Sequence, residues 1–398
     1  MSLIDTPRAN RLHIGLYGKR NVGKSSLVNA ITGQSIAVVS DVPGTTTDPV
    51  YKAMELHPVG PVVFIDTAGL DDTGDLGRLR VGKTLEAAQK TDLALVVFAA
   101  APDVETEWVA DLSRRGVPVV AVVNKADELE DAEAIRAEIK SRLRLDAIVV
   151  SARTGENVDA VRDAILAELP DDEPASITGA LAEPGDLVLL VMPQDIQAPK
   201  GRLILPQVQT LRDLLDKKCL VMSCTTDKLT ETLAALSRPP KLIITDSQVF
   251  PVVHAAKPAE SMLTSFSVLF ASYKGDIDAF VEGARGIDSL TADSKVLIAE
   301  SCTHAPLEED IGRVKIPKLL RKRFGENLQV DMLTGPGLLE DLGSYDLVIH
   351  CGGCMFNRRH VLSRIDEARQ QGVPITNYGI TIAHLTGILD KIALPAPR

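Results

Sequence analysis

The chain has 398 residues, 45% hydrophobic and 24% charged, a length and balance typical of two or three globular domains. No apolar run approaches the roughly 20 residues of a membrane helix, and the polar N-terminus lacks the core of a signal peptide, so we expect a cytoplasmic protein that binds no membrane. The net charge of −11 argues against a large nucleic-acid footprint, and five cysteines, an odd number, argue against a disulfide framework.

The N-terminal third alternates between apolar strands and helical patterns. Residues 12–18 predict a strand and a helix follows from about Ser25 to Thr32. Later runs rich in Val and Ile predict further strands at 61–69, 92–100, 118–127 and 147–153. This order predicts a mainly parallel sheet with helices on both faces.

A glycine-rich turn, GKRNVGKSS at 18–26, joins the first strand to the first helix. It fits the pattern GxxxxGK[ST], in which backbone N–H groups and a helix N-terminus bind phosphate oxygens. Lys24 is predicted to reach the β and γ phosphates, and the Ser25 hydroxyl to bind magnesium. The predicted nucleotide contacts of this turn are Gly18, Asn21, Val22, Gly23, Lys24, Ser25 and Ser26.

Three more motifs follow in order, each at the end of a strand. In DTAG (66–69), Asp66 would orient a magnesium-bound water and the Gly69 N–H would sense the γ phosphate. In NKAD (124–127), Asp127 can accept both guanine N–H groups, an arrangement that adenine cannot match. We therefore expect guanine-nucleotide binding, with supporting contacts from Asn124, Lys125, Ser151 and Ala152.

The loop DVPGTTTDP at 41–49 could order around magnesium and a γ phosphate. Thr46 is the preferred metal ligand in it, with Thr45 and Thr47 as alternatives. Leu70 stands where a Ras-like enzyme places its water-orienting Gln, so we expect slow intrinsic hydrolysis.

These motifs resemble the TrmE-Era-like GTPases, in particular the branch with an Asn in the phosphate loop and a Gly-Thr-Thr switch. The resemblance implies that Asn21 helps to bind a potassium ion that stimulates hydrolysis, with Lys24 and Thr46 as the other catalytic residues. Alternatively, Asn21 only stabilises the turn.

A linker rich in acids, Pro and Gly begins near Glu168, and a second α/β layer follows. Its four predicted strands are 186–193, 219–226, 241–248 and 265–271. RLILPQ at 202–207 could be an exposed edge strand that pairs with a second chain, or an internal hairpin arm. Cys219 and Cys224 lie along one apolar strand and are expected to be core cysteines.

A third α/β layer is predicted from strands at 295–301, 328–333, 345–352 and 374–379. The first and third of these run into Cys302 with His304, and into His350 with Cys351 and Cys354. Ligand sites in parallel sheets lie beyond the carboxyl ends of the strands, so these side chains are expected to share one site. Thiolates select zinc, copper(I) or iron–sulfur clusters, and the chemistry leaves open a cluster, a structural zinc ion or an empty thiol site.

A GTPase followed by CTH (302–304) and HCGGC (350–354) resembles the FeFe-hydrogenase maturation GTPase family, HydF, over essentially the whole chain. The resemblance implies three α/β domains: a P-loop GTPase fold at 1–172, a dimerisation domain at 173–275 and an iron–sulfur domain at 276–398. It also implies a 4Fe-4S cluster on Cys302, Cys351 and Cys354, with His304 or His350 as candidate fourth ligands.

The same resemblance implies a homodimeric scaffold, which would receive a di-iron precursor from partner radical enzymes and deliver it to apo FeFe-hydrogenase. Two other classes are weighed against it: a tRNA- or ribosome-associated GTPase with a structural zinc site, and a thiol redox sensor. The negative charge argues against the nucleic-acid class.

Overall fold

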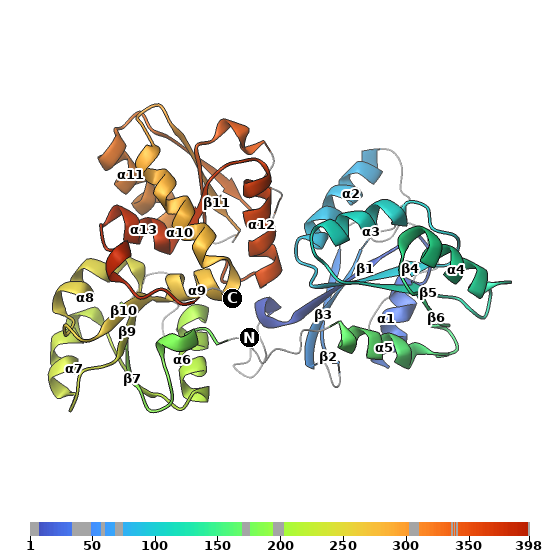
Figure 1. Ribbon diagram of the computed structural model, residues 1–398, viewed down its shortest axis with the longest axis horizontal. Helices are drawn as coiled ribbons and strands as arrows, with labels where there is room; N and C mark the ends of the chain where they lie inside the picture. Colours follow the sequence, from blue (N-terminus) through green and yellow to red (C-terminus); the bar gives the residue numbers. More distant parts are fainter. Residues whose placement is uncertain are drawn as a thin grey trace. The chain divides into compact units, whose positions relative to one another are not determined.

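The computed structural model describes residues 8–33, 49–56, 60–67, 75–168, 176–193, 203–301, 310–335, 337, 339 and 341–396. The chain divides into two compact units, residues 1–172 and 173–398 (Figure 1). Within the described ranges, every helix is too short or too polar to cross a lipid bilayer.

The first unit contains a six-stranded sheet in the order β2-β3-β1-β4-β5-β6. Every pairing is parallel except that of β2 with β3, so the predicted mainly parallel sheet is confirmed, while β2 was not predicted. The strands are β1 (Leu12–Tyr17), β2 (Val50–Leu56), β3 (Gly60–Asp66), β4 (Leu93–Phe98), β5 (Val119–Val123) and β6 (Ile148–Val149).

Helices cover both faces of this sheet, as the sequence pattern predicts. Alternate residues of β4 pack into different cores: Leu95 joins α1 and α5, whereas Val96 joins α3 and α4. Because both faces are buried, the strands read as continuous apolar runs. The helices are the short η1 (Arg8–Asn10), α1 (Lys24–Thr32), α2 (Asp75–Ala88), α3 (Glu105–Arg114), α4 (Ala132–Leu143) and α5 (Val158–Ala167).

The second unit contains two four-stranded parallel sheets, in the orders β10-β9-β7-β8 and β12-β11-β13-β14. The first is built from β7 (Leu187–Val191), β8 (Leu220–Cys224), β9 (Leu242–Thr245) and β10 (Met262–Ser265). The second is built from β11 (Lys295–Glu300), β12 (Gln329–Thr334), β13 (Leu347–His350) and β14 (Ile375–Asn377).

One hydrophobic core joins the two sheets, since it contains Ile243 of β9 as well as Ile298 of β11. Helix α10 approaches β14 so closely that a Cβ on Gly283 would lie 1.9 Å from the main-chain oxygen of Ile375. The predicted division near residue 275 falls between α9 and α10 and stays a prediction. The helices are α6 (Leu205–Asp216), α7 (Leu229–Ala235), α8 (Phe250–Ala256), α9 (Phe266–Lys274), α10 (Ile277–Arg285), α11 (Ile316–Phe324), α12 (Arg358–Gln370) and α13 (Tyr378–Leu385), with short turns η2 (Gly179–Leu181), η3 (Thr226–Lys228), η4 (Ser247–Val249), η5 (Gly286–Ser289), η6 (Ile311–Lys315), η7 (Leu342–Ser344) and η8 (Leu389–Lys391).

Two expectations for the middle layer are wrong. The described part of RLILPQ forms neither an edge strand nor a hairpin arm, because residues 203–204 are irregular and α6 begins at Leu205. The run 265–271 forms most of helix α9, and the fourth strand lies just before it. Ser265 caps this helix by accepting a hydrogen bond from the Val268 N–H at 3.2 Å. A short apolar run does not distinguish a buried helix from a buried strand.

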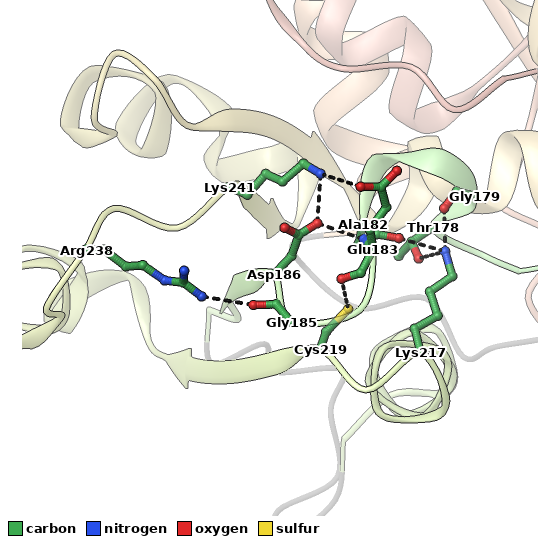
Figure 2. A network of polar contacts seen from close by, with 10 residues as sticks. All are labelled: Thr178, Gly179, Ala182, Glu183, Gly185, Asp186, Lys217, Cys219, Arg238 and Lys241. Carbon is green, nitrogen blue, oxygen red and sulfur yellow. Dashed lines mark hydrogen bonds and ion pairs between the residues drawn. The ribbon is translucent and has the colours of Figure 1, made fainter.

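Cys219 is buried, and its Sγ donates a 3.2 Å hydrogen bond to the main-chain oxygen of Glu183. Figure 2 shows this contact within a polar network in which Lys217 holds the segment around Thr178 and Lys241 pairs with Asp186 at 2.8 Å. Burial raises the pKa of the Cys219 thiol, which favours the protonated form. These contacts support the expected structural role of this cysteine.

Candidate functional site

The phosphate loop wraps tightly between β1 and α1. Gly18, Asn21 and Gly23 all have left-handed backbone conformations, with φ of 143°, 58° and 90°. A Cβ on Gly18 would lie 2.3 Å from the main-chain oxygen of Val97, so only glycine fits there. Lys24 is buried, and its Nζ donates to the main-chain oxygens of Gly18 and Lys19 at 2.8 Å. The loop therefore folds around the amino group that is predicted to bind phosphates.

The two side chains predicted to serve magnesium lie side by side. The Ser25 hydroxyl donates a 2.6 Å hydrogen bond to Oδ2 of Asp66, at the end of β3. The next residue, Thr67, donates from its hydroxyl to the main-chain oxygen of Leu16 at 2.5 Å, which anchors the strand end beside β1. Oxygen ligands from a hydroxyl and a carboxylate suit Mg²⁺.

Asn124 connects three of the sequence motifs. It is buried, and its Nδ2 donates to the main-chain oxygen of Val22 in the phosphate loop at 2.8 Å. Its Oδ1 accepts from the Ala152 N–H at 3.0 Å. The neighbouring Lys125 has a left-handed backbone, with φ of 64°. One side chain thus fixes the position of the phosphate loop relative to both loops that are predicted to hold the base.

Asp127 lies at the predicted guanine contact and has two partners. The Ser151 hydroxyl donates to its Oδ1 at 2.6 Å, and the Arg153 guanidinium pairs with it and with Glu128, the latter at 2.9 Å. The hydrogen bond from Ser151 is the main cause that holds the pKa of Asp127 below its usual value, and the hydrogen bond and charge of Arg153 contribute less. The carboxylate therefore stays ionised and able to accept guanine N–H groups. The sequence analysis did not predict the pairing of Asp127 with Arg153. The basic residue directly after Ser151 and Ala152 was the signal in the sequence that could have indicated it.

Several predicted site residues lie outside the described residues. These are Thr46 with its alternatives Thr45 and Thr47, Gly69, Leu70, Cys302 and His304. Ser26 lies in the first turn of α1.

The cysteine site forms where β11 and β13 end next to each other. The two strands are parallel, with Ala299 opposite His350. Beyond this pair, the backbone N–H of Ser301 donates a 3.2 Å hydrogen bond to Sγ of Cys351. The described ends of β11 and β13 therefore lie at the same edge of the sheet, and Cys302, which follows Ser301 in the sequence, lies outside the described residues. Cys351 is buried and Cys354 is half-buried.

His350 already uses both ring nitrogens. Its Nδ1 lies 2.5 Å from the main-chain oxygen of Cys351, and its Nε2 lies 3.1 Å from the Ser301 hydroxyl. Because a carbonyl oxygen only accepts, Nδ1 carries the proton and Nε2 accepts from Ser301. Burial lowers the pKa of His350, which favours this neutral form. To bind a metal, His350 would have to give up the bond with Ser301.

Arg364 of α12 is a buried cation beside this site. Its side chain is fully buried, and its Nη2 donates to the main-chain oxygens of Gly335 and Gly337 at 2.7 and 2.9 Å. Its Nε and Nη1 have no acceptor in the described part of the chain. The guanidinium is close enough to Cys351 to interact electrostatically with its sulfur when the thiol is ionised. Buried N–H groups and a cation beside a thiolate fit an anionic metal–thiolate centre.

The described residues alone contain no group of three His, Cys, Asp or Glu side chains arranged around a metal ion. The predicted third cysteine ligand, Cys302, lies outside them. The described part of the site, Cys351 and Cys354 with the Ser301 N–H donor and the buried Arg364, therefore supplies two thiol groups, a donor to sulfur and a cation.

Curated GTPases share similarity with 39–40% of the chain. The tRNA modification GTPase MnmE of Paraburkholderia xenovorans is 37% identical over 158 residues, which is 39% of this chain and 34% of that protein. GTPase Der of Wolinella succinogenes is 33% identical over 39% of this chain and 36% of its own length. GTPase Era of Trichlorobacter lovleyi is 31% identical over 40% of this chain and 56% of its own length. The chain therefore spans between 34% and 56% of the length of these curated relatives.

Among solved structures, a crystal structure of Era in complex with MgGDPNP and 16S ribosomal RNA nucleotides has a TM-score of 0.37 and 20% identity, over 54% of this chain and 92% of that one.

Three family models together cover most of the chain. A model described as 50S ribosome-binding GTPase matches residues 13–125. The hydrogen maturase F dimerization domain matches residues 177–275, and the hydrogen maturase F tetramerization domain matches residues 278–395. Because both models of the second unit describe one maturase and the first unit is a GTPase domain, the chain belongs to the hydrogen maturase F (HydF) family.

Proposed function

We propose that this chain is a GTP-hydrolysing scaffold that holds a 4Fe-4S cluster on Cys302, Cys351 and Cys354 and delivers a di-iron precursor to apo FeFe-hydrogenase. The hydrogen bond from the Ser301 amide to Sγ of Cys351, at the meeting point of two strand ends, carries the proposal. Backbone N–H donors to sulfur are a common feature of iron–sulfur sites. Membership of the maturase family supports the same role.

Three cysteines leave one iron of a cubane cluster without a protein thiolate. The fourth position would be filled by His304, an acidic side chain or water, or by His350 after it loses its bond with Ser301. Such a cluster would supply one exchangeable coordination position, which suits a carrier that must release what it holds. The buried charge of Arg364 would balance part of the negative charge of the cluster and its thiolates.

The GTPase domain would bind GTP with magnesium between Ser25 and Asp66 and guanine at Asp127. We infer slow hydrolysis, because Leu70 cannot orient a water, and stimulation by potassium through Asn21. Asn21 also suits the backbone of the phosphate loop, because Asn tolerates the left-handed conformation at this position. The nucleotide would switch the affinity for partners through the loops around Thr46 and Gly69.

The maturase domains indicate oligomerisation, and we propose a homodimer formed through the first sheet of the second unit. Strand β8 is an edge strand of this sheet. Its Leu220 and Met222 are 56% and 41% exposed, and Leu215 at the end of α6 is 51% exposed. Large exposed apolar side chains on an unpaired edge are typical of a strand that pairs with a second chain.

The proposed partners are the radical enzymes that make the di-iron precursor and the apo-hydrogenase that receives it, in the reducing cytoplasm where free thiols persist. Nucleic acid and membranes are not among them. The competing proposal, a tRNA- or ribosome-associated GTPase with a structural zinc site, accounts for the GTPase segment only, because residues 177–275 and 278–395 match maturase domains.

A transfer assay tests the proposed function. The chain is purified without oxygen from cells that also express the radical maturases, and is then mixed with apo FeFe-hydrogenase. Hydrogen evolution that appears with the wild-type chain and not with a Cys351→Ser, Cys354→Ser variant is the expected result. Equal hydrogen evolution with the wild-type chain and the variant would contradict the carrier role. So would the absence of hydrogen evolution with either chain when both maturases are active.

A further inference from the structure

Lys274, the last residue of α9, is a buried lysine that binds the loop between β13 and α12. This loop, residues 351–357, carries both described cysteines of the site and is called the cysteine loop below. Lys274 is only 2% exposed, and its Nζ donates to the main-chain oxygens of Cys354 at 2.9 Å and of Phe356 at 2.7 Å. Buried lysines are rare in proteins unless they have such partners.

Arg358, the first residue of α12, makes the reciprocal contact. Its Nη1 donates to the main-chain oxygens of Ser272 at 3.2 Å, Tyr273 at 3.4 Å and Gly275 at 2.6 Å. These carbonyls lie at the C-terminal end of α9, where a helix leaves its last oxygens without intrahelical partners and where a positive charge is favourable. Lys274 and Arg358 therefore form a two-cation clamp between the end of α9 and the cysteine loop.

Other hydrogen bonds also hold the cysteine loop, including that from the Ser301 N–H to Sγ of Cys351. The Cys351 N–H donates to the main-chain oxygen of Ala299 at 3.0 Å, and the Phe356 N–H donates to that of Gly353 at 3.0 Å. Gly353 has a left-handed backbone, with φ of 57°. Cys354 itself lies outside the strand and the helix. Its carbonyl contact with Lys274 thus ties the backbone of this cysteine directly to another element.

The clamp also joins two segments that separate family models describe. Lys274 lies in the segment that matches the dimerization domain, and the cysteine loop with Arg358 lies in the segment that matches the tetramerization domain. Metal centres require ligand atoms within about 0.2 Å of their bonding distance, so residues that fix a ligand backbone also influence metal binding.

We propose that Lys274 and Arg358 are positioning residues for the ligand Cys354, and that through them α9 of the dimerization segment controls the geometry of the metal site. This inference rests on the proposed function, because it takes Cys354 as a cluster ligand. Lys274 and Arg358 lie in the second unit and the nucleotide motifs lie in the first, so removal of the clamp is expected to leave GTP hydrolysis unchanged.

Hydrogen exchange of the full chain without metal tests the clamp directly. We compare the wild type with Lys274→Met and Arg358→Met, and follow peptides that contain residues 352–357 by mass spectrometry. Each variant should speed exchange of this segment at least about tenfold, because Lys274→Met removes charged hydrogen bonds to two carbonyls of the loop and Arg358→Met removes those that join the end of the loop to α9. Lys257→Met is the matched control: its Nζ also binds a main-chain oxygen, that of Ser261 at 2.7 Å, away from the cysteine loop. The control should leave exchange of the loop unchanged.

Cluster spectroscopy on the reconstituted chains gives the second measurement. Both clamp variants should bind less than half the iron of the wild type, or show an altered EPR line shape and midpoint potential, whereas Lys257→Met should match the wild type. If Lys274→Met fails to fold, Arg358→Met carries the same prediction, because Arg358 is only half-buried.

The failures of the two proposals are distinguishable. Suppose that the wild-type chain holds its cluster and that the clamp variants show unchanged loop exchange and an unchanged EPR signal. This result would overturn the clamp proposal alone. A wild-type chain that takes up no cluster would overturn the proposed function, and with it the role of Cys354 as a cluster ligand.

Discussion

The side-chain amide of Asn124 donates a hydrogen bond to the main-chain oxygen of Val22 at 2.8 Å, so the guanine motif holds the phosphate loop in place. There is no free space beside this bond. A Cβ on Gly23 would lie 2.3 Å from Nδ2 of Asn124, and the backbone of Gly23 has a φ of 90°, which other residues rarely adopt.

The first prediction follows from this contact. Gly23→Ala should weaken GTP binding at least about tenfold, because it strains the backbone and displaces Asn124 from both of its loops. Isothermal titration with GTP and magnesium measures the effect. Gly33→Ala is the control: Gly33 also has a positive φ, 66°, but a Cβ there would meet no atom within 4 Å. The two variants binding GTP equally would show that the contact with Asn124 is not important.

The second prediction concerns potassium and Asn21. GTP hydrolysis should be at least about tenfold faster in potassium than in sodium buffer if a bound ion supplies positive charge to the transition state. Asn21→Gly should abolish the difference, since glycine keeps the backbone φ of 58° while removing the side-chain oxygen. Equal wild-type rates in both buffers would leave Asn21 with a structural role only.

Much of this architecture could be predicted from the sequence, because parallel strands buried on both faces read as runs of Val and Ile and place their motifs at one edge. The prediction failed at residues 265–271, where Ser265 caps a buried helix. It also missed Arg153, Lys274 and Arg364, whose charges are paired or buried through contacts far along the chain. Sequence alone does not show which of many Arg and Lys side chains point inward.

The third prediction concerns the buried charge of Arg364. Arg364→Met should make the reduction potential of the cluster more negative, on the order of tens of millivolts, because a nearby cation favours the addition of an electron. Arg364→Lys retains the charge and should shift the potential less. Redox titration followed by EPR measures both variants, with their melting temperatures as a check on folding. Identical reduction potentials in the wild type and both variants would show that the guanidinium of Arg364 does not influence the cluster.

The fourth prediction addresses the edge of the first sheet in the second unit. Met222→Lys should convert the proposed dimer into a monomer, because it places a charge on the exposed face of β8, where Met222 is 41% exposed. Sedimentation velocity measures the oligomeric state. Val252→Lys changes a residue of α8 that is 54% exposed and should leave the dimer intact. A dimer that survives Met222→Lys would exclude pairing through this strand.

The most direct measurement of the central proposal is EPR of the chain after anaerobic reconstitution with iron and sulfide and subsequent reduction. The wild type should show the signal of a reduced 4Fe-4S cluster and about four irons per chain, as expected for one cubane. The Cys302→Ser, Cys351→Ser, Cys354→Ser variant should show neither, while it hydrolyses GTP at the wild-type rate. A wild-type chain that retains zinc and shows no such signal would contradict the scaffold proposal and favour a GTPase with a structural metal site.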